Sequence, residues 1–160
     1  MYNRDWQINV VNVEVAKRLV KIGFTDPTNY IYTTNIINSR TGEYLDADEE
    51  WSMKVNGLEK FIERIPFGRL EYSSHFRNGY NGHTDYHISA PELEHVQEWL
   101  RDRYIDINIM LVNYEFSKRQ YVYQIIDTLG NKVIASKEKF DSYEEALEEA
   151  INTAVTKLNF

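Results

Sequence analysis

All four histidines of the chain lie between residues 75 and 95, together with an aspartate, and they are its clearest potential metal ligands. In the stretch HTDYHIS, the spacing of His83 and Asp85 matches the first two ligands of the facial triad that binds non-haem iron. On a strand, however, residues 83 and 87 lie about 13 Å apart. That separation is too large for two imidazoles on one ion, because each metal–nitrogen bond is only about 2.1 Å long. No histidine follows His95 to complete a triad.

We therefore interpret HTDYHIS as a polar strand that leads into a helix, with no metal, cofactor or catalytic residue assigned. A metal-dependent hydrolase or oxygenase is the alternative hypothesis. Its ligands would come from His75, His83, Asp85 and His87.

The other reactive side chains form no catalytic motif. Ser73 and Ser74 precede His75, but the G-x-S-x-G elbow of serine hydrolases is absent, as are the P-loop and the dinucleotide-binding glycine pattern. The acidic stretch EYLDADEE is not a calcium loop, because Trp51 and Gly57 stand where that loop needs glycine and glutamate. It is predicted to be a solvated loop that runs into a helix.

Size and charge limit the functions open to this protein. With 160 residues, 42% of them hydrophobic, the chain can bury a core as a single domain without disulfides or metals. Its net charge of −7 disfavours nucleic-acid binding, which requires clustered lysine and arginine. It has no cysteine, no apolar leader in MYNRDWQINV and no apolar run of about 18 residues, so we expect a cytoplasmic, non-membrane protein.

The first half of the chain alternates between helical and extended patterns. Asn12 suits a helix N-cap and Gly23 a helix end, and Pro66 would stop a second helix. The predicted elements are a helix at 12–22, a strand at 29–37, a turn at 38–42, a short helix at 57–66, and two strands within 67–89 around a loop at 77–82. Residues 44–82 are the least regular part and form a candidate insertion in a single domain, 1–160.

The second half has clearer patterns. Ser89 and Glu92 have the spacing of a capping box, and overlapping capping boxes begin at Asp141 and Ser142. The predicted elements are a helix lined by Leu93, Val96, Leu100 and Tyr104, strands at 105–111, 121–127 and 132–140, a hairpin turn at 129–131, and an amphipathic helix up to Leu158. The chain is thus predicted to be an α+β protein, with an antiparallel sheet packed by helices and a C-terminal helix–three strands–helix unit.

The order of these C-terminal elements resembles that of a double-stranded-RNA-binding domain. In that family, lysines at the start of the last helix contact phosphates. Here the matching stretch is DSYEEALEEA, whose carboxylates would repel phosphate.

The twelve tyrosines offer another possible binding surface, since aromatic side chains on a sheet can anchor a partner. Tyr121 and Tyr123 are the candidate binding residues, although cross-strand packing is the commoner role of such tyrosines.

Three stretches along the chain resemble a widespread family of small uncharacterised proteins encoded by phages and prophages of gut bacteria. They are VEVAKRLVKIGFTDPTNYIY, ISAPELEHVQEWLRDRYIDINIML and SYEEALEEAINTAVTKL, in the same order as in that family. The chain departs from the family pattern over residues 44–82. The resemblance implies a phage context and adds no catalytic residue. We therefore expect a non-enzymatic module that binds a host or phage protein, and self-association into a homo-oligomer is compatible with this.

Overall fold

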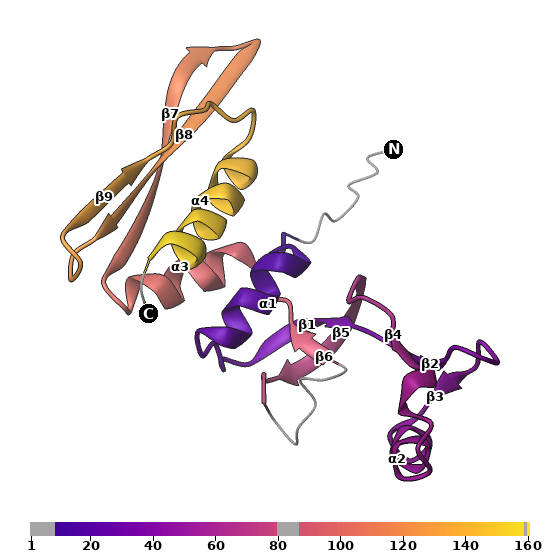
Figure 1. The fold of residues 1–160 in the computed structure, drawn as a ribbon. Helices are drawn as coiled ribbons and strands as arrows, with labels where there is room; N and C mark the ends of the chain where they lie inside the picture. The colour runs from indigo at the N-terminus through magenta and orange to yellow at the C-terminus, as the bar shows by residue number, and fades with distance from the viewer. Residues whose placement is uncertain (1–8, 80–86, 159) are drawn as a thin grey trace. The chain divides into compact units, whose positions relative to one another are not determined.

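The computed structural model describes residues 9–79, 87–158 and 160, and these fall into two compact units (Figure 1). The terminal unit consists of Met1–Phe24 and Ala90–Phe160, and the central unit is Thr25–Ser89. Among the described residues there are four α-helices and three antiparallel sheets, which confirms the predicted α+β class. The candidate insertion, 44–82, lies inside the central unit.

The first helix of the terminal unit, α1 (Val13–Lys21), begins and ends as predicted. The Asn12 side chain accepts a hydrogen bond from the backbone N–H of Val15 at 3.0 Å. Gly23 has a φ of +91°, which glycine adopts without strain, and the chain turns there. The residues that α1 buries are Val15, Ala16 and Leu19.

The C-terminal part of the terminal unit has the predicted helix–three strands–helix order. The strands β7 (Ile105–Glu115), β8 (Lys118–Asp127) and β9 (Lys132–Ala135) form an antiparallel sheet in that order. The helices α3 (Leu93–Arg101) and α4 (Tyr143–Lys157) precede and follow it. Helix α4 packs on β7, β8, α1 and α3, and its buried residues are Ala146, Leu147, Ala150, Ile151, Thr153, Ala154 and Val155.

The start of α3 differs from the predicted capping box. Ser89 is a residue of strand β6, paired with Ile31, and the N-cap is Glu92, whose side chain makes no capping bond. The N-terminal backbone supplies the missing partners, because the N–H of Leu93 donates to the carbonyl of Asn9 at 2.9 Å. A tertiary backbone contact thus does what the sequence pattern assigned to a side chain.

The central unit holds two small sheets. In the first, β1 (Thr28–Thr33) lies between β5 (Arg69–Phe76) and β6 (His87–Ser89). In the second, β2 (Ile36–Asn38) lies between β3 (Tyr44–Leu45) and β4 (Ile62–Arg64). Helix α2 (Ala47–Val55) follows β3, and a 3₁₀ turn, η1 (Glu59–Phe61), precedes β4.

Several predicted elements have different bounds or types. Helix α3 ends at Arg101, so Tyr104, which was predicted to line it, lies outside with a φ of +63°. The strand expected at 29–37 is divided between the two sheets, because residues 34 and 35 lie outside both strands. The helix expected at 57–66 is wrong: Gly57, with a φ of +73°, ends α2, and Ile62 already pairs with Asn38. The helix of this region is α2, which lies before Gly57 and begins in the acidic stretch. The last strand is shorter than 132–140, although Phe140 rejoins the sheet through a bridge to Tyr121.

The core of the terminal unit gives a direct stability prediction. Ile125 on β8 is fully buried, so Ile125→Ala should lower the free energy of unfolding by about 2–5 kcal/mol through lost burial and a residual cavity. Leu129→Ala is the control, because that side chain is 75% exposed and its loss should change stability by less than about 0.5 kcal/mol. Urea denaturation followed by circular dichroism measures both. Equal destabilisation would contradict this description of the core.

Candidate functional site

The histidine cluster is only partly within the described residues. His83 and Asp85 lie outside them, whereas His75 is on β5 and His87 is on β6, the two strands that flank β1. His75 has a φ of +57° where the register of β1 and β5 shifts, and the His87 ring packs against Phe76 at 6.3 Å. Over the part of the chain that can be described, no three His, Asp or Glu side chains converge as a metal site would require.

The two candidate tyrosines both make contacts within the terminal unit. Tyr123 is 7% exposed, and its hydroxyl lies 3.1 Å from that of Thr153 on α4. It also lines a cavity of ≈ 380 Å³ between β9 and α4. Tyr121 is half-buried and meets the ring of Tyr143 edge-on at 6.2 Å. These contacts tie strand β8 to α4 and are those of packing residues.

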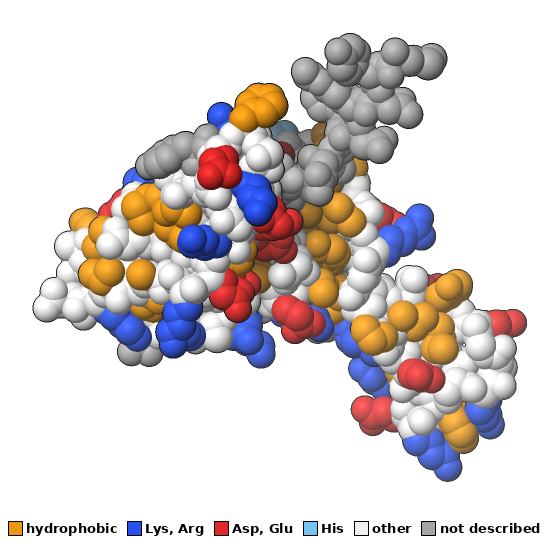
Figure 2. Space-filling view, turned by 90° about the horizontal axis from the view of Figure 1, so that it is seen from above, with side chains coloured by type: hydrophobic (Ala, Val, Ile, Leu, Met, Phe, Trp, Pro, Cys, Tyr) orange, Lys and Arg blue, Asp and Glu red, His pale blue; other side chains and the backbone are white. Residues whose placement is uncertain are grey.

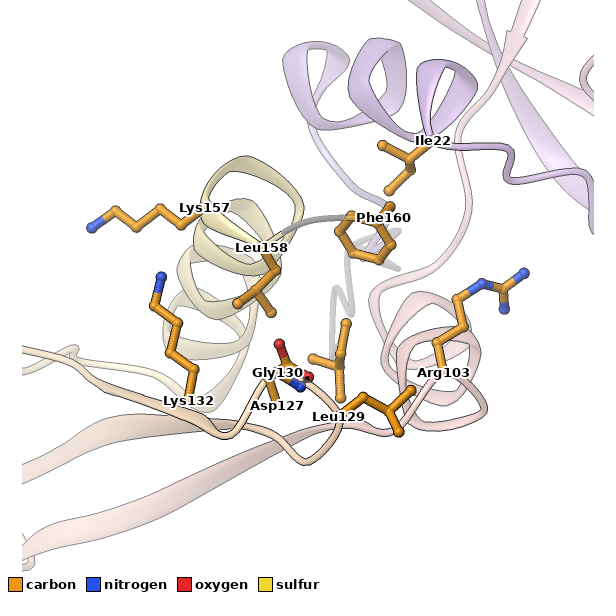
Figure 3. Close-up of a pocket in the computed structure, with 10 residues that line it drawn as sticks. Ile22, Arg103, Asp127, Leu129, Gly130, Lys132, Lys157, Leu158 and Phe160 are labelled. Atoms are coloured by element: carbon orange, nitrogen blue, oxygen red, sulfur yellow. Dashed lines mark hydrogen bonds between the residues drawn. The ribbon is translucent and has the colours of Figure 1, made fainter.

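A larger pocket, of ≈ 580 Å³, opens beside the β8–β9 turn of the terminal unit (Figure 3). Its apolar lining comes from Ile22, Ile105, Leu129, Leu158 and Phe160. Arg103, Lys132 and Lys157 lie around this lining, and Asp127 is its one acid. The Asp127 carboxylate accepts a hydrogen bond from the backbone N–H of Gly130 at 2.8 Å, so it is engaged in the turn.

The ionisable side chains of this pocket are one carboxylate and three cations. Its lining residues include no hydroxyl, thiol or imidazole group, and the Asp127 carboxylate is already bonded within the turn. The Arg103 guanidinium lies 3.6 Å from the Trp99 ring centroid and donates to the Trp99 carbonyl. Arg103 therefore serves to hold the end of α3, and Figure 3 shows its side chain directed away from Lys132 and Lys157.

Helix α2 of the central unit presents large hydrophobic side chains to solvent. Trp51 is 68% exposed and Val55 is 62% exposed, whereas Met53 on the opposite side of the helix is buried. Residues four apart lie on one face of a helix, and we call the surface formed by Trp51 and Val55 the α2 face. On the face of the molecule that Figure 2 shows, hydrophobic side chains are interspersed with acidic and basic ones. No periodic apolar stripe in the sequence identifies this face.

Acidic side chains surround the start of α2. The Asp46 carboxylate caps the helix by accepting from the Glu49 N–H at 2.7 Å. The same residue raises the pKa of the Glu49 carboxyl, first through a side-chain hydrogen bond and then through like-charge repulsion. Glu49 is fully exposed, so this shift arises from a crowded helix terminus and does not indicate a buried acid.

The comparisons with known proteins found no matching protein family, curated protein or solved structure. None of the helices within the described residues is long and apolar enough to cross a membrane.

The raised pKa of Glu49 can be tested directly. Asp46→Asn removes the like charge and keeps a capping oxygen, so the pKa of Glu49 should fall towards that of an ordinary glutamate. Because the pKa is raised in the folded state, Glu49 favours folding at acidic pH, and this contribution is lost as the pH rises through the folded-state pKa. Carboxyl-carbon NMR titration of both proteins measures the effect. Identical Glu49 titration curves would contradict the assigned cause.

Proposed function

We propose that this chain is a non-enzymatic protein-binding module and that the α2 face is its contact surface. The exposure of Trp51 carries the proposal. Trp is among the residue types that contribute most to binding energy at protein interfaces, and here 68% of this side chain is exposed on an ordered helix. An uncovered indole ring has a large apolar surface that a partner can remove from water.

The local structure holds the α2 face in place before any partner arrives. Asp46 caps the start of the helix, and the Lys54 ammonium lies 2.9 Å from the Glu50 carboxylate across one turn. The backbone N–H of Leu58 closes the end of the helix by donating to the Met53 carbonyl at 2.8 Å. A preformed helix loses little conformational entropy on binding. The arrangement suits the mode in which a helix places one apolar face in a groove of its partner.

The charges around α2 define the kind of partner that fits. Asp46, Asp48 and Glu49 lie at the start of the helix and are all exposed, and Glu43 precedes them. A partner should therefore offer an apolar groove with lysine or arginine on the rim that meets this end. Such charges accelerate association and weaken with salt.

The resemblance to proteins of phages and prophages supports the biological setting of this proposal. Within that setting, the partner is a protein of the bacterial host or of the phage itself, and the chain acts as a small accessory factor. A module of this kind needs a specific surface and no reactive group.

The proposal predicts partner capture that depends on Trp51. Purified chain should enrich a specific protein from lysate of a gut bacterium that carries such phages, and Trp51→Ala should weaken binding of that protein roughly tenfold or more. Raising the salt concentration from about 0.05 M to 0.5 M should weaken it further through screening. Isothermal titration calorimetry with the recovered partner measures both effects.

Phe116→Ala is the matched control, because this aromatic side chain is fully exposed in the terminal unit. It should leave partner binding unchanged. Recovery of the same protein by the wild-type chain and by Trp51→Ala with equal affinity would refute the role of the α2 face. A chain that enriches nothing from several host strains would refute the function itself.

A further inference from the structure

The sheet of the terminal unit is covered by helix on one face, and its other face is open. Ile105 and Ile107 of β7 and Tyr123 and Ile125 of β8 are buried on the side where α4 packs. Alternate residues point to the opposite side, where Met110 is 42% exposed. We call the part of this side that precedes the register shift between Leu111 and Asn113 the outer sheet face. Its residues are Asp106, Asn108, Met110, Val122, Gln124, Ile126, Val133 and Ala135.

The strand register places these residues in neighbouring rows. Ile126 lies between Asp106 and Val133, which are its partners on the two flanking strands. In the next row, Gln124 lies between Asn108 and Ala135. Met110 pairs with Val122 in the row after that. Cross-strand neighbours on one face touch, so the aliphatic side chains form a continuous surface around two amides.

This face carries almost no charge, in a chain of which 27% is charged. Within these rows its one ionisable group is Asp106, whose carboxylate lies 3.6 Å from the Arg101 guanidinium. The same side of β8 becomes charged only at Lys118, which pairs with Glu115 where the β7–β8 hairpin turns. A sheet with one face in water normally alternates apolar residues inside with polar ones outside. Here the aliphatic side chains of the outer face include Val133, which is 61% exposed. Contiguous exposed apolar surface of this kind marks an interaction site.

We propose that a second copy of this chain covers the outer sheet face. Two copies of a protein with a net charge of −7 repel each other, so they can associate only through surfaces where like charges do not meet. The outer sheet face is such a surface, because its single acid is already paired. A partner selected by opposite charge would need unpaired charges on this face, and the residues that define the face provide none.

The face is also complementary to itself. In a twofold dimer the same patch meets its own copy, so every group must tolerate its equivalent. Aliphatic side chains do so by packing, as in two sheets stacked about 10 Å apart. The Asn108 and Gln124 amides each contain donors and an acceptor, so they can pair with their counterparts across the axis.

The test is the mass of the full chain in solution. Sedimentation equilibrium and light scattering at micromolar concentration should give twice the chain mass of 19.0 kDa. Met110→Lys and Val133→Lys place charges on exposed positions of the face and should yield monomers whose circular dichroism matches the wild type. The control is Leu129→Lys, at a side chain that is 75% exposed in the β8–β9 turn, and it should stay dimeric. A monomeric wild type, or lysine variants as dimeric as the control, would overturn the proposal.

A second measurement covers the case in which a lysine variant fails to fold. The chain has no cysteine, so Asn108→Cys can form a disulfide only between copies. Under mild oxidation it should run as a crosslinked dimer on non-reducing gels, and Leu129→Cys should not. Equal crosslinking at both positions, or at neither, would count against the proposed interface.

Trp51→Ala should remain dimeric, so loss of partner binding and loss of the dimer are separable. A monomer that instead binds another protein through Met110 would also exclude a second copy as the occupant.

Discussion

Burial of α4 against the inner face of the β7–β8–β9 sheet is the interaction on which the terminal unit depends. The buried side chains of α4 include Ala146, Leu147, Ala150, Ile151 and Ala154. The Tyr123 hydroxyl of β8 lies 3.1 Å from the Thr153 hydroxyl of the helix. The same helix contacts α1 and α3, so one apolar stripe organises most of the unit. Because residues alternate along each strand, fixing the inner face also fixes which side chains the outer face must display.

The two surfaces proposed for binding, the α2 face and the outer sheet face, contain none of the histidines and neither of the two candidate tyrosines. His75 and His87 lie on the two strands that flank β1, and His95 lies on α3. The two candidate tyrosines pack within the terminal unit. By contrast, Trp51 and Met110 are hydrophobic side chains on regular elements with no covering element in the described chain. Exposed apolar surface on an ordered element is stronger evidence for binding than a polar cluster, since polar side chains are expected in water.

The two surfaces belong to different units and differ in chemistry. The α2 face combines an indole ring with nearby carboxylates, and so favours a basic partner. The outer sheet face carries one acid, Asp106, which is paired with Arg101. If both proposals hold, one protein would self-associate through the terminal unit and present the α2 face of its central unit to another protein. Two copies would then offer two such helices, which increases the avidity for a partner with repeated sites.

The sequence by itself determined the elements whose signals are local. Helix α1 follows from the Asn12 cap and Gly23, α4 from Ser142 and its apolar stripe, and the β8–β9 turn from its short polar loop. These features depend on residues within one turn or one hairpin, and the structure reproduces them. The α+β class followed from the same patterns.

Only the tertiary structure decided the features that depend on distant partners. Residues 57–66 have helical spacing, yet residues 62–64 form strand β4, in which Ile62 pairs with Asn38. The start of α3 is satisfied by the Asn9 carbonyl and not by the Ser89 side chain. The exposure of Trp51 cannot be predicted from the sequence, because a large hydrophobic side chain is normally expected in the core. The structure shows that α2 buries Met53 and leaves Trp51 on its solvent-exposed side. Hydrogen-bond partners and solvent exposure are set by segments far apart in the chain, so no local pattern could encode them.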